Sequence, residues 1–246
     1  MNEGSSTRLP WSRFGAEAAI IVASILLALG VDEWRQERQD RRLEREYLIR
    51  LVEDLDTNLS ILNDQQKADA KKVANARKVF SLVAHGNRGD LTPDNAVIAA
   101  YLASPSDTPN WVDDTFEELK STGRFELIQN PDIRIGLLAY YRTLEVGDWA
   151  YQLMSTDYRD AIRERMDPDL QLAIRGLCGQ ERHDCQASLD GYEYDEFVDW
   201  LAGNRELADG LTRVIVQWTR GEKEYLPRVR MGTAELKELI EAELDP

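Results

Sequence analysis

The sequence predicts an all-α protein in which an N-terminal transmembrane helix continues into an irregular antiparallel helical bundle. Two observations support the continuous helix: an apolar stretch of membrane-spanning length at 14–34, and the lack of any Gly or Pro from residue 31 to residue 85. A third observation supports the bundle, because apolar residues recur at helical spacing in the rest of the chain and no period-two strand pattern appears.

The apolar stretch at 14–34 fits a membrane anchor that follows a short N-terminal tail, 1–13. No charged residue occurs from Ala18 to Val31. Trp11 and Trp34 bracket the stretch and would lie ~35 Å apart on a helix, which exceeds a ~30 Å hydrocarbon core. Both indoles would then lie in the interfacial regions, where tryptophans concentrate. A cleavable signal peptide ending at Ala28-Leu29-Gly30 is the alternative. We favour the uncleaved anchor, because strong helix formers follow without a polar cleavage region.

Small residues recur every fourth position in the anchor, at Gly15, Ala19 and Ala23. This spacing lets two transmembrane helices approach closely, so we expect the face to self-associate. Glu17 is an intramembrane carboxylate, and such groups are functional candidates. One turn from Arg13, it can also pair with that arginine at the interface.

Two features of the sequence disagree on which side of the membrane the soluble part lies. Arg35–Arg45 contains more arginines than the N-terminal tail, which favours a cytoplasmic domain. Cys178 and Cys185 could close a short disulfide loop, which favours an oxidising compartment. We place the domain on the periplasmic side of a bacterial inner membrane. A zinc site at Cys178, His183 and Cys185 is a weaker alternative, because it lacks a CxxC pair, and two free thiols remain an option.

A polar stalk, 35–42, precedes the bundle domain, 43–246. The stalk has no apolar residue on any face and would extend ~12 Å from the bilayer. Apolar residues then follow heptad spacing, and Gln66 and Asp69 interrupt the pattern. The heptad residues are Leu48, Val52, Leu55, Leu59 and Leu62, then Val73, Ala76, Phe80 and Val83. Two heptads on each side of a polar break indicate packing in a bundle rather than a dedicated coiled coil.

Capping residues, prolines and glycines divide the rest of the chain into further helices. Pro93 and Pro168 each take the first position of a short helix, and Gly123 ends the helix that begins at Asp113 or Asp114. Asn130-Pro131 opens a long helix whose apolar stripe reaches Ile162. The last predicted helices are 194–202, 205–226 and 233–244, with Pro227 breaking or kinking the chain between the last two.

Two segments together resemble an uncharacterised family of bacterial single-pass membrane proteins. The first is the anchor with the residues that follow it, GAE…ILLALGVDEWRQER, and the second is EELKSTGRFELIQN. The matching residues are Gly15, Glu17, Trp34, Glu37 and Arg38, then Glu117, Glu118, Leu119, Ser121, Thr122, Gly123, Leu127, Ile128 and Asn130. The resemblance covers about a fifth of the chain and does not include the cysteine loop. It implies an anchored helical domain and no known activity or cofactor.

The sequence contains no phosphate-binding loop, dinucleotide fingerprint, nucleophile elbow, HExxH or CxxC, and only two histidines. We therefore expect no metal or cofactor and lean against an enzyme. Asp148 lies on the tyrosine-rich stripe with Tyr141 and Tyr151, which makes these residues the best pocket candidates. A core aspartate bonded to a tyrosine hydroxyl is the structural alternative.

The formal net charge of −15 argues against nucleic acid as a partner. We expect a membrane-anchored helical interaction module, which would act as a scaffold, accessory subunit or sensor-like domain. Its partners would be the lipid bilayer and either a second copy or another membrane protein. The alternative function is a ligand-binding or enzymatic bundle with a polar pocket near Asp148.

Overall fold

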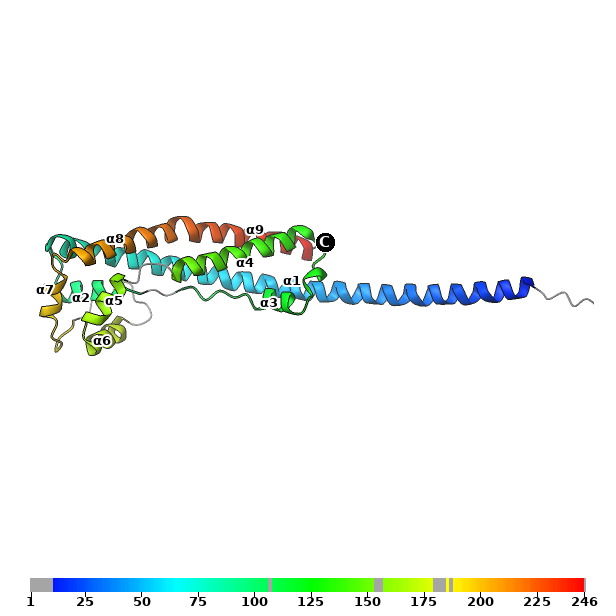
Figure 1. Ribbon diagram of the computed structural model, residues 1–246, viewed down its shortest axis with the longest axis horizontal. Helices are drawn as coiled ribbons and strands as arrows, with labels where there is room; N and C mark the ends of the chain where they lie inside the picture. Colours follow the sequence, from blue (N-terminus) through cyan, green and yellow to red (C-terminus); the bar gives the residue numbers. More distant parts are fainter. Residues whose placement is uncertain (1–10, 106–107, 153–156, 179–184, 186–187, 246) are drawn as a thin grey trace, which may run out of the picture.

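A single long helix, α1 (Trp11–His85), runs through the whole molecule and projects far beyond it at one end (Figure 1). The computed structural model describes residues 11–105, 108–152, 157–178, 185 and 188–245, with only the backbone of 11–23 and 152. α1 ends at His85, and the next residue, Gly86, has a φ of +66°, which is accessible to glycine at little cost. The prediction that the helix runs from the apolar stretch to Gly86 without a break is confirmed.

The remaining elements are all helical within the described residues. They are α2 (Pro93–Leu102), α3 (Asp114–Ser121), the 3-10 turn η1 (Phe125–Leu127), α4 (Pro131–Gln152), α5 (Asp157–Arg165), α6 (Pro168–Cys178), α7 (Asp195–Leu201), α8 (Arg205–Arg220), the π-helical turn η2 (Gly221–Tyr225) and α9 (Leu226–Leu244). The described part of the chain contains no strand, so the predicted all-α fold class is confirmed. α8 and α9 run back along α1, and α4 lies beside α9 (Figure 1).

Buried side chains form two hydrophobic cores that share α1. The proximal core lies nearer the projecting end and joins α1 to α3, α4 and α9; it includes Leu51, Leu55, Leu62, Leu119, Leu137, Val229 and Ile240. The distal core joins the last turns of α1 to α2, α5, α6, α7 and α8; it includes Val79, Val83, Ile98, Ile162, Ile174 and Leu211. The predicted bundle packing of α1 is therefore confirmed.

Of the two effects predicted for Pro227, a break or a kink, the break is wrong. A proline inside a helix lacks an N–H group, and its ring clashes with the carbonyl four residues earlier. Here the wider turn η2 precedes it, and the Leu226 N–H bonds to the Gly221 carbonyl. Pro227 thereby becomes one of the first residues of α9, which starts at Leu226 rather than Thr233.

The expected long helix from Pro131 to Ile162 is two elements, α4 and α5, and residues 153–156 between them lie outside the described residues. Its apolar stripe is divided between the cores. Leu137, Tyr141 and Leu144 belong to the proximal core. Tyr151, Tyr158 and Ile162 belong to the distal core. The single apolar stripe seen in the sequence therefore packs in two separate cores.

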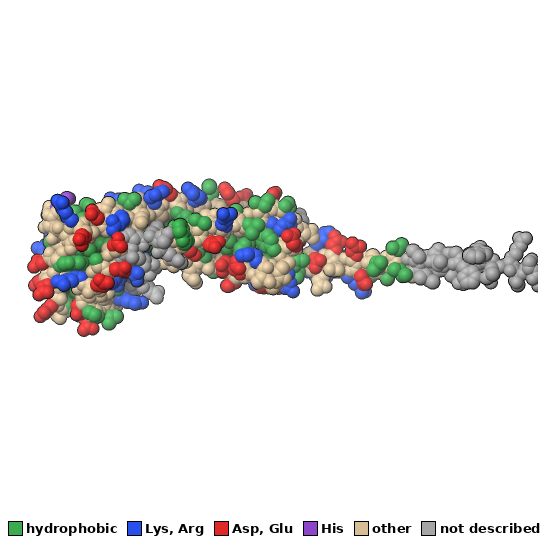
Figure 2. All heavy atoms as spheres, in the orientation of Figure 1, with side chains coloured by type: hydrophobic (Ala, Val, Ile, Leu, Met, Phe, Trp, Pro, Cys, Tyr) green, Lys and Arg blue, Asp and Glu red, His purple; other side chains and the backbone are tan. Residues whose placement is uncertain are grey.

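The projecting part of α1 exposes large apolar side chains, from 48 % for Val31 to 71 % for Leu27. Figure 2 shows them beyond the charged surface of the bundle. Residues 14–23 of the predicted anchor have no described side chains. In the part of the chain that the structure describes, no helix has an apolar stretch long enough to span a bilayer.

Candidate functional site

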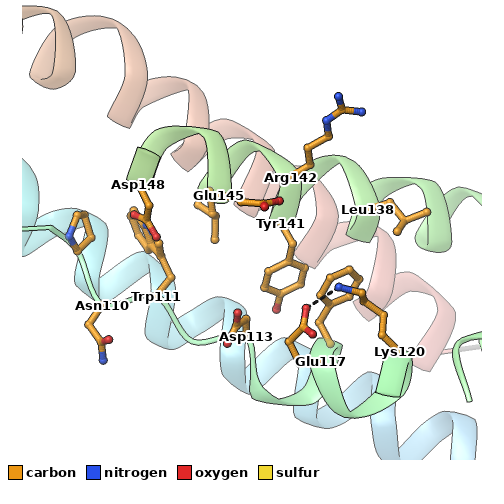
Figure 3. Close-up of a pocket in the computed structure, with 13 residues that line it drawn as sticks. Asn110, Trp111, Asp113, Glu117, Lys120, Leu138, Tyr141, Arg142, Glu145 and Asp148 are labelled. Carbon is orange, nitrogen blue, oxygen red and sulfur yellow. Dashed lines mark hydrogen bonds and ion pairs between the residues drawn. The ribbon is translucent and has the colours of Figure 1, made fainter. Parts of the chain in front are cut away.

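A cleft of about 870 Å³ lies between α4 and the extended segment that leads into α3 (Figure 3). One wall is held to α1 by Asn58, which is fully buried. The Asn58 amide donates to the Val112 carbonyl at 2.9 Å and accepts from the Val112 N–H at 2.8 Å. One turn earlier, the Asp54 carboxylate accepts from the Thr115 N–H at 3.2 Å. This wall is therefore positioned by side chains of the longest helix.

The opposite wall is one face of α4. Tyr141, Leu144, Glu145 and Asp148 follow one another at helical spacing and all line the cleft. The Tyr141 ring stacks on Phe116 of α3, with centroids 4.2 Å apart and planes 12° apart. Two aromatic rings from different elements thus form a rigid floor.

Asp148 is half-buried at one end of the cleft. The Trp111 indole N–H donates to Asp148 Oδ1 at 2.9 Å. Burial raises the pKa of the Asp148 carboxyl, the Trp111 hydrogen bond lowers it, and the charge of Asp113 raises it further. The indole bond orients the carboxylate. Asp148 Oδ2 has no hydrogen-bond partner among the described residues.

Asp113 faces the same space from the opposite wall (Figure 3). Its carboxyl pKa is raised by burial first and then by the like charges of Glu117 and Asp114. Glu117 is neutralised by Lys120, whose Nζ lies 2.7 Å from its Oε1. Carboxylates therefore dominate the polar lining of the cleft.

The Tyr141 hydroxyl is an unusual feature of this site. The residue is only 7 % exposed, and its hydroxyl has no hydrogen-bond partner among the described residues. Figure 3 shows it directed between Asp113 and Glu117. Burial, and then the charges of Asp54 and other acids, raise the Tyr141 pKa. The group is therefore a neutral phenol that can donate and accept.

The structure brings together two of the three residues predicted to form a pocket, Tyr141 and Asp148. Tyr151 lies elsewhere, with its hydroxyl donating to Asp69 Oδ2 at 3.0 Å. The tyrosine partner considered for Asp148 is replaced by Trp111. Sequence reasoning missed Trp111, because it lies in an irregular segment where no periodicity marks a buried face.

Asp69 is the centre of a buried polar cluster between the two cores. It is fully buried, accepts from Gln65 Nε2 at 2.7 Å, and lies 3.9 Å from Lys72 Nζ. That ammonium lies 3.1 Å from the centroid of the Trp218 ring. Burial raises the pKa of Asp69 to about 6, while the Lys72 charge and the Tyr151 bond lower it. The interrupted heptad was the sequence signal for this cluster.

The EELKSTG segment contributes Glu117 and Lys120 to the cleft, whereas its Glu118 contacts α1. Glu118 accepts from the Tyr47 hydroxyl at 2.7 Å and from Arg50 at 2.6 Å. The Arg124 guanidinium donates to the same Tyr47 oxygen at 3.0 Å. Hydrogen bonds to Arg50 and Tyr47 lower the pKa of Glu118. Glu118 of the resemblance motif thus has a structural role.

Cys178 and Cys185 are joined by a disulfide, with Cα atoms 5.1 Å apart. A disulfide leaves no thiolate to bind zinc, and His183 lies outside the described residues. No cluster of three or more His, Cys, Asp or Glu side chains suited to a metal occurs in the described part of the chain.

The anchor candidates Gly15, Glu17, Ala19 and Ala23 lie on the α1 backbone, and their surroundings are outside the described residues.

Comparisons of the chain with protein-family models, curated proteins and solved structures found no match. The resemblance to a family of single-pass membrane proteins therefore stays a prediction that rests on the motif residues.

Proposed function

We propose that this chain is a membrane-anchored helical interaction module of the bacterial inner membrane. Residues 14–34 form the anchor, 35–42 form the stalk, and the bundle works as a scaffold, accessory subunit or sensor-like domain. Its partner is a second copy of the chain or another membrane protein. The charge-poor N-terminal end attaches the protein to the membrane, and the acidic bundle contacts the partner.

The observation that carries the proposal is the exposure of the projecting apolar helix. Leu26, Leu27 and Leu29 are between 60 % and 71 % exposed, and they point in different directions around α1. An apolar surface on all sides of a helix is unfavourable in water and favourable in lipid. The bundle leaves this surface uncovered within the described residues, so a bilayer is the environment that it fits.

The disulfide supports a periplasmic position for the bundle. Disulfides persist in oxidising compartments and are rare in the cytosol. The arginines of the stalk are interleaved with acids, and one of them is already paired, since Arg41 lies 2.7 Å from Glu37. Thiol labelling of Cys178 and Cys185 in intact cells, with and without reductant, tests this orientation.

Membrane attachment is tested by placing a charge in the projecting helix. Leu27→Arg puts a guanidinium near the centre of the proposed anchor, which costs about 3 kcal/mol of insertion free energy. We expect most of this variant to leave the membrane fraction after alkaline extraction. Gln36→Arg, at an exposed stalk position, is the matched control and should stay bound. Full extraction of the wild-type chain contradicts the anchor.

Interaction is tested by cross-linking the full chain in native membranes. We expect a dimer, or a complex with a second membrane protein. If Gly15, Ala19 and Ala23 form the contact, Ala19→Leu should reduce the dimer at least severalfold, while Ile21→Leu on another face should not. A wild-type chain that yields only monomer and no partner contradicts the module.

A second candidate function is a ligand-binding bundle, which the cleft between Tyr141 and Asp148 favours. Clefts of this size that combine aromatic walls with a few convergent polar groups are typical of small-molecule sites. Binding of probes of different charge to the full-length protein tests this function. If a substitution in the cleft abolishes binding of a probe, that probe binds at this site.

A further inference from the structure

Three carboxylates in the cleft lack a basic partner. Asp113, Glu145 and Asp148 form no ion pair with any described residue, whereas Glu117 is paired with Lys120. Arg142 also lines the cleft, but its side chain extends along the outer side of α4 (Figure 3) and forms no ion pair with these three carboxylates. Three like charges around one half-enclosed space repel one another, so a cation entering the cleft gains from all three.

The Tyr141 hydroxyl is a second, independent observation, because among the four buried side-chain groups of the described residues that lack a hydrogen-bond partner it is the one that lines this cleft. A buried hydroxyl without a hydrogen bond costs about 1–3 kcal/mol, and native proteins rarely leave one unsatisfied. Its oxygen has two lone pairs and can accept an N–H donor that enters between the two walls. A ligand whose N–H groups enter the cleft would satisfy this hydroxyl, and the free Oδ2 of Asp148 is a further acceptor in the same cleft.

The aromatic floor already holds an ammonium group from the protein itself. Lys120 Nζ lies 4.9 Å from the centroid of Phe116, beside the carboxylate of Glu117. An ammonium above an aromatic face and next to a carboxylate is a favourable arrangement. The other end of the cleft offers groups of the same kinds, namely the Trp111 ring and the Asp148 carboxylate, with Tyr141 between the two ends (Figure 3).

We propose that the cleft binds an organic cation, namely an ammonium or guanidinium group on an aliphatic chain. Asp148 and Asp113 bind the charge, the Tyr141 hydroxyl accepts one N–H, and the Trp111 and Phe116 rings contact the aliphatic part. The group can belong to a free amine or to a lysine or arginine side chain of a peptide. The proposal rests on the ligand-binding function proposed above and names its ligand class.

The test measures binding by calorimetry on the full-length protein in nanodiscs of zwitterionic lipid. Cadaverine is the cationic probe, and pentanediol and glutarate are neutral and anionic probes of similar length. A lysine-containing tripeptide distinguishes a free amine from a peptide side chain. We expect cadaverine, the tripeptide or both to bind, and neither of the other probes.

Two conservative variants locate the site. Asp148→Asn keeps an oxygen for the Trp111 bond, and Tyr141→Phe removes a hydroxyl that has no partner, so both should fold. We expect cadaverine affinity to fall about tenfold in the first and severalfold in the second. Asp132→Asn removes the same charge from an exposed position of α4 and should leave affinity nearly unchanged.

The outcomes separate the two proposals. This site is overturned if Asp148→Asn and Asp132→Asn lower the cadaverine affinity equally. It is also overturned if Tyr141→Phe leaves that affinity unchanged. Binding of pentanediol or glutarate that Tyr141→Phe abolishes overturns the cationic ligand and leaves the ligand-binding function intact. The absence of binding by every probe to the folded protein counts against both.

Discussion

At the scale of single residues, Asp69 shows how a polar side chain is tolerated between two hydrophobic cores. Gln65 and Tyr151 each donate to one of its oxygens. Lys72 lies nearby and is itself only 5 % exposed. Burial disfavours the charged carboxylate more than these partners favour it, so the Asp69 pKa rises to about 6. The cluster makes the stability of the fold depend on pH.

Asp69 should take up a proton on folding between its usual pKa of 3.8 and about 6. In this window the folded state binds more protons than the unfolded state, so stability falls as pH rises. The slope is up to about 1.4 kcal/mol per pH unit, and the total is about 3 kcal/mol. Denaturant unfolding of wild type and Asp69→Asn across pH 4 to 7 should show this slope only in wild type.

Asp64→Asn is the control for that measurement, because Asp64 lies on the same helix with a largely exposed side chain. Its pH dependence should match that of wild type. An identical slope in wild type and Asp69→Asn would show that the Asp69 pKa is not raised.

At the scale of elements, the packing of α4 against η2 depends on one glycine. A Cβ at Gly147 would lie 1.8 Å from the Tyr225 hydroxyl oxygen and 2.2 Å from its ring carbon Cζ. Tyr225 belongs to the π-helical turn that allows α8 to continue into α9 past Pro227. The close approach of α4 therefore needs the missing side chain.

Gly147→Ala should destabilise the protein by about 1–3 kcal/mol, because the rigid Tyr225 ring must move. Gly232→Ala is the matched control within α9, where a Cβ meets nothing within 4 Å. This second change should stabilise the protein by about 0.5–1 kcal/mol through the lower entropy of the unfolded chain. Thermal or denaturant unfolding measures both, and a Gly147→Ala variant as stable as Gly232→Ala contradicts the proposed contact.

At the scale of the whole molecule, α1 connects two cores of different construction. The proximal core joins long helices α4 and α9 to α1. The distal core joins α1 and α8 to the short helices α2, α5, α6 and α7, and the disulfide lies there, since Cys178 and the partly buried Cys185 both pack against it. Short helices have little stability of their own, so the distal end relies more on tertiary contacts and the cross-link.

Removing the disulfide should therefore affect the two cores unequally. For a loop as short as Cys178–Cys185 the chain-entropy model gives about 2.5 kcal/mol. In Cys178→Ala/Cys185→Ala, hydrogen exchange should rise in α5, α6 and α7. Exchange in α3, α4 and α9 serves as the internal control and should change little. An equal rise in both cores contradicts a separate role for the distal end.

Some features were predictable because they depend on neighbours along the chain. The unbroken helix up to Gly86 follows from the lack of Gly and Pro, and the first residues of α2 and α6 follow from Pro93 and Pro168. These features are set by backbone sterics and local hydrogen bonds, which a sequence window contains. The pairing of Tyr141 with Asp148 in one cleft also follows from their spacing on α4.

Other features depended on residues far apart in the chain. The Trp111–Asp148 bond, the separation of Tyr151 from Tyr141 and the passage of the helix through Pro227 were not visible in any window. Each depends on how distant segments pack against one another. This packing determines which side chains meet, and residue spacing along the chain does not reveal it.

The sequence by itself therefore determined that this chain is helical, acidic and continuous from its apolar N-terminal stretch into a bundle, because helix propensity, composition and apolar periodicity are local properties. Only the tertiary structure decided that two cores share α1, that Asp69 is buried between them, and that the cleft lining is rich in unpaired carboxylates around an orphan tyrosine. Burial and charge pairing depend on which distant surfaces meet, and packing alone settles that.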